Sequence, residues 1–373
     1  MKGPMDKPLK TRLLHFILKS ILGKRSKEFD NSNSLKQILI IRQHNQFGDM
    51  LATIPLFRAI KKKFPKSELT VVASPANYAG VTSTSYIDEL VVFDKTKLSD
   101  FEYLKILGKV LRGKRYDLVI VPSTVSLSFT SHLLAAIAKS DFVIGAKSLN
   151  EKGNDAAYLL NKSVELNWKP ENRHVSDFII DVVRPIGINE KDFTTELVIG
   201  NENQKYAEDF FAKFNHHCEL KIGFHVGAGK PQNRWKISNF KELINKLNRI
   251  ENLCIYFTGS TADEEQIVQM IKAFGNSAGY LLNKPIPDVA AVITNSDLFI
   301  TNDTGIMHVA GATDVPQISL FGQTNPLQWA PIGDNKYFIK KEDDINSISV
   351  ESVYSLALKL LYNKIIDKNK KED

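Results

Sequence analysis

Three short segments of this 373-residue chain place charged, hydroxyl and glycine residues directly after apolar runs. The first, Arg42–Met50, follows the run Ile38–Ile41 and precedes a pattern typical of a helix. Gly48 permits a tight turn, and Asp49 then stands near the start of that helix. A carboxylate at such a place either caps the helix or acts as a general base that removes a proton from an attacking hydroxyl group.

The second segment, His225–Lys230, contains two glycines and is followed by Asn233–Trp235. Gly227 lets the backbone approach a phosphate closely, and Lys230 and Arg234 can neutralise the phosphate charge. The segment lacks the Gly-Lys-Ser/Thr ending of a P-loop and the spacing of the dinucleotide fingerprint. The segment therefore indicates an anion-binding loop that is neither a P-loop nor a dinucleotide-binding loop.

The third segment, Thr301–His308, again follows an apolar run and opens onto a helical pattern. Asp303 or Thr304 would cap that helix, and the free amides at its start would form an anion site that suits a diphosphate. His308 lies one turn into the helix and would face the same ligand. A lone histidine in such a place is more often structural, but the neighbouring motifs favour a functional residue here.

Apolar runs with strand character alternate with helical patterns along the chain, which is typical of parallel sheets with helices on both faces. The chain is long enough for two domains of roughly 150 residues each. We predict two doubly wound α/β units, with the three segments at the carboxyl ends of strands, where ligands bind in such sheets. The polar stretch 145–173 is predicted to be a loop.

The composition is that of a folded globular protein, with 43% hydrophobic and 24% charged residues. The net charge of +7 would suit an anionic partner, but much of the excess lies in the first 25 residues and in the tail 364–371. No platform of interleaved basic and aromatic residues is visible, so we predict no nucleic-acid partner. Cys218 and Cys254 lack metal-ligand spacing, and we expect reduced thiols rather than a disulfide or a zinc site.

Residues 9–25 form a basic amphipathic pattern that ends near Gly23. Such a helix either lies in a membrane interface or docks on the protein's own surface, and the sequence does not decide between these alternatives. The chain shows no apolar run long enough to span a membrane and no signal-peptide pattern, which predicts a cytoplasmic protein.

Together the three segments, in this order, resemble glycosyltransferase family 9, the bacterial lipopolysaccharide heptosyltransferases, over residues 38–333. A fourth segment, Leu320–Pro326, matches the family's Leu-Phe-Gly-x-Thr-x-Pro pattern. The resemblance implies a GT-B architecture, in which two Rossmann-like, doubly wound parallel-sheet domains face a cleft. The N-terminal domain would hold the acceptor and the C-terminal domain the nucleotide sugar. It also implies an inverting reaction without a bound metal or cofactor.

By the same resemblance Asp49 is the catalytic base. The expected donor-binding residues are Gly227, Lys230, Arg234, Asp303, Thr304, Gly305 and His308. Asn233 stands where many family members carry a lysine, which makes Lys230 a candidate replacement. Either Asp263 or Glu264 corresponds to the family's acidic residue after the next strand.

The expected partners are a nucleotide-sugar donor, with ADP-heptose as first choice, and a lipid-linked glycan acceptor such as a lipopolysaccharide core. The basic helix would hold the protein on the cytoplasmic face of the inner membrane. UDP- or GDP-hexose is an alternative donor, and a catalytically silent nucleotide-sugar-binding subunit is an alternative from another class. The predicted divisions are a basic amphipathic extension (1–34), an acceptor domain (35–190), a nucleotide-sugar domain (191–345) and a C-terminal helix with a basic tail (346–373).

Overall fold

In a computed structural model, the chain is described at residues 9–30, 34–43, 47–82, 84–167, 172–214 and 217–372. It divides into two compact units. The first holds residues up to Tyr78 and from Ser85 to Phe193, and the second holds residues from Thr194 onward together with Ala79–Thr84. The first candidate segment therefore belongs to one unit and the other two segments belong to the second.

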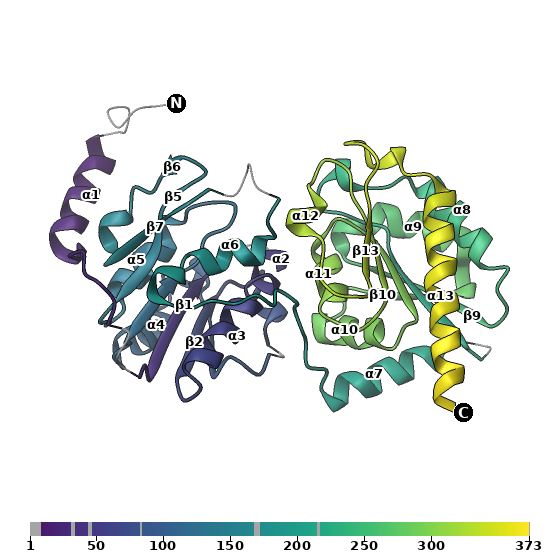
Figure 1. The fold of residues 1–373 in the computed structure, drawn as a ribbon, viewed down its shortest axis with the longest axis horizontal. Coiled ribbons are helices and arrows are strands. Elements are labelled where there is room, and N and C mark those ends of the chain that lie inside the picture. Colours follow the sequence, from purple (N-terminus) through teal and green to yellow (C-terminus); the bar gives the residue numbers. More distant parts are fainter. Residues whose placement is uncertain are drawn as a thin grey trace. The chain divides into compact units, whose positions relative to one another are not determined.

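The strands of the first unit are β1 (Gln37–Arg42), β2 (Glu68–Ala73), β3 (Glu89–Val92), β4 (Leu118–Val121), β5 (Val143–Leu149), β6 (Lys152–Gly153) and β7 (Lys162–Leu166). They form one sheet with the order β3-β2-β1-β4-β5-β6, and β7 also pairs with β5 (Figure 1). The pairs are parallel except that of β5 with β6. Nearly all of β1 is buried, as expected of a central parallel strand.

The helices of the first unit are α1 (Leu9–Leu22), α2 (Phe47–Leu51), α3 (Ile54–Lys63), α4 (Phe101–Arg112), α5 (Phe129–Ile137) and α6 (Val175–Asp181). Side chains of β1 and β4 form a core cluster with α4 and α5, represented by Leu39, Leu107 and Leu134. α3 and α6 pack against each other outside that cluster. Figure 1 shows helices on both sides of the sheet, so the unit is doubly wound.

The second unit contains the strands β8 (Leu220–His225), β9 (Leu253–Gly259), β10 (Ala278–Leu282), β11 (Leu298–Asn302), β12 (Gln317–Leu320) and β13 (Lys336–Ile339). Their order is β10-β9-β8-β11-β12-β13, and the paired strands are parallel. This order is that of a Rossmann sheet. The two doubly wound parallel sheets confirm the predicted fold class.

The helices of the second unit are α7 (Asn201–Phe211), α8 (Ile237–Leu247), α9 (Glu264–Phe274), α10 (Ile286–Thr294), α11 (Gly305–Gly311), α12 (Pro326–Trp329) and α13 (Val350–Glu372). α7 and α10 pack together, and α13 packs along α8 (Figure 1). Val353 and Ala357 of α13 lie in the same buried cluster as Phe240 of α8. The buried side chains of α13 thus belong to the core of the second unit.

The prediction of a loop over residues 145–173 is wrong, because the end of β5 and all of β6 and β7 lie there. β6 has two residues, and both are exposed. Along β7, Lys162 and Glu165 are among the polar residues, and Leu166 is the fully buried one. Strands at the edge of a sheet do not need a continuous apolar run, so their pattern was not visible in the sequence.

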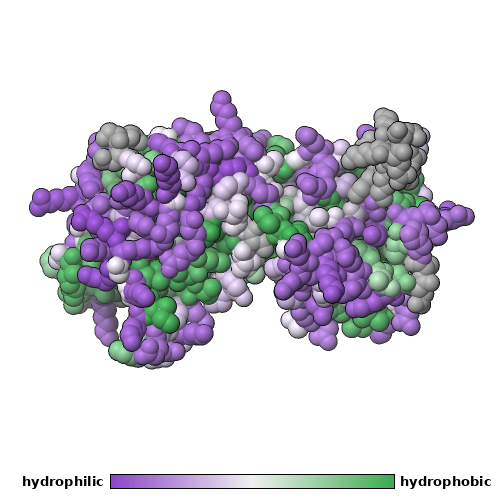
Figure 2. Space-filling view, turned by 90° about the horizontal axis from the view of Figure 1, so that it is seen from below, coloured by the Kyte–Doolittle hydropathy of each residue, from purple (hydrophilic) through white to green (hydrophobic). Residues whose placement is uncertain are grey.

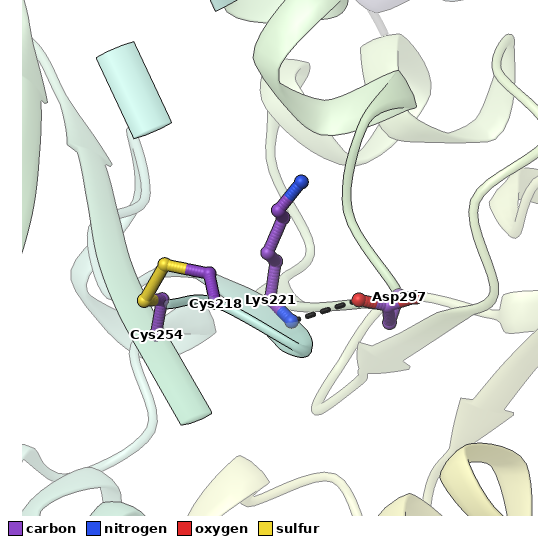
Figure 3. Close-up of a disulfide and its surroundings, with 4 residues drawn as sticks. All are labelled: Cys218, Lys221, Cys254 and Asp297. Carbon is purple, nitrogen blue, oxygen red and sulfur yellow. Dashed lines mark hydrogen bonds between the residues drawn. A yellow bond between two sulfur atoms is a disulfide. The ribbon is translucent and has the colours of Figure 1, made fainter. Parts of the chain in front are cut away.

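The expectation of reduced cysteines is also wrong, because Cys218 and Cys254 form a disulfide with their Cα atoms 5.4 Å apart (Figure 3). Cys218 precedes β8, and the parallel pairing of β8 with β9 aligns Lys221 with Cys254. The separation of 36 residues along the chain therefore hides a close approach in space. At the same end of the sheet, the Lys221 amide donates to Asp297 Oδ2 at 2.8 Å (Figure 3). The start of β8 is thus held to both of its neighbours, β9 and β11.

α1 packs one face against the first unit. His15 Nδ1 lies 3.1 Å from the Tyr158 hydroxyl oxygen, and the His15 ring makes edge contacts with Phe129 and Tyr158. Leu22 packs at the same place. The exposed apolar side chains of the helix are Leu13, Leu14, Phe16, Ile17 and Ile21. Docking on the protein's own surface therefore uses one part of the apolar surface of α1 and leaves the rest open.

The surface seen in Figure 2 is mainly hydrophilic, and hydrophobic residues gather in smaller areas. Exposed apolar side chains also occur outside α1, for example Phe101 at the start of α4, which is 76% exposed. Within the described ranges, no helix combines the length and apolar character that crossing a bilayer requires.

Candidate functional site

The carboxyl ends of β1 and β4 carry the first candidate site. These strands are neighbours at the point where the strand order reverses, which is where ligands bind in doubly wound sheets. The chain after β1 leads to Asp49 in α2, and the loop after β4 carries Thr124. Thr124 Oγ1 donates to Asp49 Oδ2 at 2.9 Å, and Arg42 Nη2 lies 3.6 Å from the same oxygen. Residues 44–46 of the predicted segment lie outside the described residues.

Asp49 is 2% exposed, and its Oδ1 atom is buried without a hydrogen-bond partner among the residues that the structure describes. Burial raises the pKa of Asp49, while the charge of Arg42 and the hydroxyl of Thr124 oppose the rise. The carboxylate faces these two side chains, which belong to other elements, and it is the third residue of α2 rather than its cap. A buried carboxylate oxygen without a partner costs free energy, so its presence points to function rather than to capping.

Arg42, the last residue of β1, is fully buried beside Asp49. Its guanidinium donates to Thr53 Oγ1 (3.2 Å), Pro122 O (3.4 Å), Asp49 O (3.2 Å) and Thr124 Oγ1 (3.0 Å). Thr53 Oγ1 also donates to Asp49 O at 2.7 Å. One guanidinium therefore connects the ends of β1 and β4 with the start of the helical segment after β1.

The carboxyl ends of β8 and β11 carry the second candidate site, again where the strand order reverses. Asn302, the last residue of β11, is fully buried and connects the end of β11 to the segment that follows β8. Its Nδ2 donates to the carbonyl oxygens of Val226 at 3.0 Å and Gly227 at 3.1 Å. Its Oδ1 accepts from the Trp235 amide at 3.2 Å. The Asn302 amide thus fixes the backbone of the glycine-containing loop.

Asp303 follows Asn302 and is influenced by one of the predicted cations, Lys230. Its Oδ2 accepts a hydrogen bond from Asn233 Nδ2 at 2.8 Å. Burial raises the pKa of Asp303, and a hydrogen bond from Thr324 and the charge of Lys230 act in the opposite direction. Asn233 thus serves Asp303 as an uncharged partner, and Lys230 supplies the positive charge.

The remaining predicted residues flank the same loops. Arg234 Nε donates to a carbonyl oxygen of the loop after β8 at 2.9 Å. Thr304 precedes α11, which begins at Gly305, and its side chain makes no capping hydrogen bond. His308 lies edge-on to Trp329, with ring centroids 6.4 Å apart. The first amides of α11 are therefore not covered by the Thr304 side chain.

A cavity of about 290 Å³ lies at this edge of the second sheet and is lined by residues at and after the ends of β8, β9, β10 and β11. One part of its lining is polar: His225, Thr258, Ser260, Asp263, Asn283, Lys284 and Thr304. Another part is apolar: Leu281, Ile286, Val289 and Ile306. A concave site that combines apolar walls with convergent polar groups is typical of sites for small polar ligands.

Asp263, rather than Glu264, is the acidic residue of this cavity. Asp263 is 6% exposed and lines the cavity, whereas Glu264 is exposed at the start of α9. Gly227 allows this placement, because a Cβ atom on Gly227 would overlap the Asp263 carboxylate. His225 Nδ1 lies 2.9 Å from Thr258 Oγ1, and burial lowers the pKa of His225, which favours the neutral ring.

The structure brings the predicted donor residues to one edge of the second sheet and places Asp49 at the corresponding edge of the first. Among these donor residues, Thr304 lines the cavity, while Lys230 acts on Asp303 beside it. Sequence reasoning missed three residues of the site: His225 and Thr258, which line the cavity, and Asn302, which holds the loop after β8. Their position as strand-end residues was the available signal, because each stands at the carboxyl end of a buried run.

Comparison with known proteins supports an enzyme with this fold. The model of the family described as "Glycosyltransferase family 9 (heptosyltransferase)" matches residues 105–356 of this chain. A lipopolysaccharide core heptosyltransferase of Haemophilus influenzae is 25% identical over 318 residues, which cover 83% of this chain and 86% of that protein.

Solved structures show the same architecture. A glycosyltransferase of family 9 from Veillonella parvula superposes with a TM-score of 0.77 at 22% identity, covering 90% of this chain and 100% of that one. The Escherichia coli ADP-heptose lipopolysaccharide heptosyltransferase II superposes with a TM-score of 0.72 at 22% identity, covering 88% and 99% of the two chains.

Proposed function

The chain belongs to glycosyltransferase family 9, and from this premise we propose that it transfers heptose from ADP-heptose to a lipopolysaccharide core or a related surface glycan. It is a glycosyltransferase with the GT-B fold. The observation that carries the proposed mechanism is the buried Oδ1 atom of Asp49, which has no hydrogen-bond partner in the described part of the chain. The choice of donor and acceptor is supported by the names of relatives, which include an ADP-heptose transferase and a lipopolysaccharide core heptosyltransferase.

In the proposed reaction, Asp49 Oδ1 accepts the proton of an acceptor hydroxyl group. The acceptor oxygen attacks the anomeric carbon on the face opposite the nucleoside diphosphate, so the configuration at that carbon is inverted. Because burial raises the pKa of Asp49, its carboxylate is a stronger base than an exposed aspartate. The proton is thus removed as the new glycosidic bond forms.

The second unit would bind the donor. We place the nucleoside in the cavity beside His225 and Asp263, with the diphosphate toward the start of α11. Backbone amides there and the cations Lys230 and Arg234 would stabilise the charge of the departing diphosphate. The proposed mechanism assigns this stabilisation to the protein and not to a metal ion. Lys230 is the main cation of the proposal, since it already acts on Asp303.

We further propose that α1 holds the enzyme on the cytoplasmic face of the inner membrane, where a lipid-linked acceptor is available. Phe16 and Ile21 are 69% and 73% exposed on a helix that is docked through His15. Arg12 and Lys19 are exposed on the same helix and suit anionic lipid head groups. An amphipathic helix fixed in this way can insert apolar side chains without crossing the bilayer.

The donor assignment is tested by calorimetric titration of the purified protein with ADP, UDP, GDP and ADP-heptose, carried out both without and with EDTA. Preferential binding of ADP and ADP-heptose is expected. A preference for UDP or GDP would keep the reaction class and replace the donor with a hexosyl nucleotide. Loss of binding on addition of EDTA would contradict the metal-independent part of the proposal.

The base is tested with Asp49→Asn, which keeps the size of the side chain and removes the basic oxygen. We expect ADP binding to be retained and turnover to fall by about 10²-fold or more. A wild-type protein that binds ADP-heptose but transfers no sugar to any surface-glycan acceptor would instead favour a silent binding subunit. Unchanged turnover in Asp49→Asn would show that Asp49 is not the base.

A further inference from the structure

We propose that Arg42 and Thr124 are positioning residues that hold Asp49 as an ionised base with one oxygen directed to the acceptor. This inference rests on the proposed role of Asp49 and assigns the means by which the chain maintains it. Neither residue is expected to touch the sugar. The two side chains come from the ends of neighbouring strands, β1 and β4, and meet at the same carboxylate oxygen.

The two oxygens of Asp49 have different surroundings. Oδ2 accepts from Thr124 Oγ1 at 2.9 Å and lies 3.6 Å from Arg42 Nη2. Oδ1 is buried too, and none of the described residues forms a hydrogen bond with it. Since one oxygen is anchored, rotation of the carboxylate is restricted, and the other oxygen remains free for a proton. A general base needs this combination of fixed geometry and a free lone pair.

Arg42 also fixes the backbone that carries Asp49. Its Nη2 donates to Asp49 O at 3.2 Å, and Thr53 Oγ1 donates to the same carbonyl oxygen at 2.7 Å. The backbone of Arg42 is itself held, because Asn77 Nδ2 donates to its carbonyl oxygen at 3.0 Å. The planar guanidinium of Arg42 has several N–H donors and can donate to Asp49 O and its other acceptors at the same time. A lysine ammonium group cannot reproduce this forked arrangement of donors.

A fully buried arginine is expensive to maintain, and an apolar residue of similar volume is often at least as stabilising. Stability alone therefore does not explain why an arginine stands at position 42, and a functional role does. In the described residues, Arg42 is the charged side chain that acts on Asp49, and the loop after β4 contributes the uncharged Thr124. Both favour the ionised carboxylate, whereas burial favours the protonated one, so the two side chains oppose the effect of burial on the base.

The test is the pH dependence of kcat/KM for sugar transfer, measured for the wild type, Arg42→Lys, Arg42→Met and Thr124→Val. The acid limb of this profile reports the pKa of the base in the free enzyme. We expect the limb to move to higher pH, by about 1–3 pH units in Arg42→Met and by less in Arg42→Lys and Thr124→Val. The affinity for ADP, which serves as the check of folding, should remain unchanged because the donor site lies in the second unit.

Arg58→Lys is the matched control. Arg58 is also buried in the first unit, but it pairs with Glu190 and Asp192 instead of Asp49. It should lower the melting temperature without moving the acid limb. If Arg42→Met does not fold, Thr124→Val, which removes one hydroxyl group at nearly constant volume, decides the question.

Three outcomes are distinguishable. A shifted limb in the Arg42 and Thr124 variants, with an unshifted limb in Arg58→Lys, supports the inference. An inactive Asp49→Asn together with unshifted limbs and a uniform loss of rate in the Arg42 and Thr124 variants overturns it, since their part would then be structural. An active Asp49→Asn overturns both the proposed base and this inference.

Discussion

Gly227 and Asp263 are packed so closely that a Cβ atom on the glycine would overlap the carboxylate of the aspartate. Gly227 follows β8 and Asp263 precedes α9, so the contact joins loops from two neighbouring strands. Asp263 Oδ2 is also fixed by the amide and hydroxyl of Ser260, both within 2.9 Å. The acidic wall of the cavity therefore depends on the absence of a side chain at position 227.

The variant Gly227→Ala should displace Asp263 and weaken donor binding. We expect the dissociation constant of ADP to rise about tenfold or more, which corresponds to roughly 1.4 kcal/mol. Calorimetric titration measures the change. Gly108→Ala on α4 is the control, because a Cβ atom there also meets no protein atom within 4 Å and the residue lies in the first unit, outside the cavity. Equal effects of the two substitutions would show that the contact with Asp263 does not set the affinity.

Asn302 should be needed for both the stability of the second unit and the shape of the proposed donor site. Asn302→Asp keeps an acceptor for the Trp235 amide but loses both donors to Val226 O and Gly227 O. Leaving these buried carbonyl groups without partners should lower the free energy of unfolding by about 1–3 kcal/mol. Chemical denaturation measures the loss, and ADP titration should show weaker binding.

The control for Asn302 is Ser319→Ala, which removes one buried hydroxyl group of β12 that accepts from Gln317. It should cost stability without changing the affinity for ADP. If Asn302→Asp bound ADP as tightly as the wild type, the amide would stabilise the fold without shaping the site.

The predictable parts of the fold are the elements whose burial is visible in the sequence as a continuous run of apolar residues. β1 could be predicted because a central parallel strand is apolar on both faces, as Ile38–Ile41 are. The position of Asp49 after that strand followed from the same pattern. The partnership of Arg42 with Thr124 could not be predicted, because the two residues are 82 positions apart and meet through the pairing of β1 with β4. The bond between Cys218 and Cys254 was hidden for the same reason.

Lys336 should make the stability of the protein depend on pH. Its ammonium group donates to Ala310 O in the last turn of α11 and to Thr313 O and Val315 O after that helix, and burial lowers the pKa of Lys336 to about 7 from 10.5. Between these two values the unfolded chain holds a proton that the folded chain has released. Higher pH therefore favours the folded state over this window, by at most about 1.4 kcal/mol per pH unit, and below pH 7 the effect of Lys336 is constant.

Lys336→Met removes this group and should remove its share of the pH dependence. Denaturation at pH 7, 8 and 9 should show that the wild type gains stability relative to Lys336→Met as the pH rises. Parallel stability curves for the two proteins would contradict the lowered pKa of Lys336.

The exposed face of α1 should bind anionic membranes. We expect the double variant Phe16→Ser and Ile21→Ser to lose most of its binding to vesicles that contain phosphatidylglycerol, because both side chains are largely exposed and would contribute apolar area to the interface. Its melting temperature and its affinity for ADP should change little, since both side chains are largely exposed and the contact of His15 with Tyr158 is kept. Vesicle co-sedimentation measures the binding.

Two comparisons separate membrane binding from general adhesion. Phe101→Ser on α4 removes an equally exposed aromatic side chain away from α1 and should leave vesicle binding intact. Added salt should weaken the binding of the wild type, because Arg12 and Lys19 would contribute through charge. Undiminished vesicle binding by the double variant would show that α1 is not the membrane contact. Equal binding of the wild type to neutral phosphatidylcholine vesicles would show that Arg12 and Lys19 do not contribute through charge.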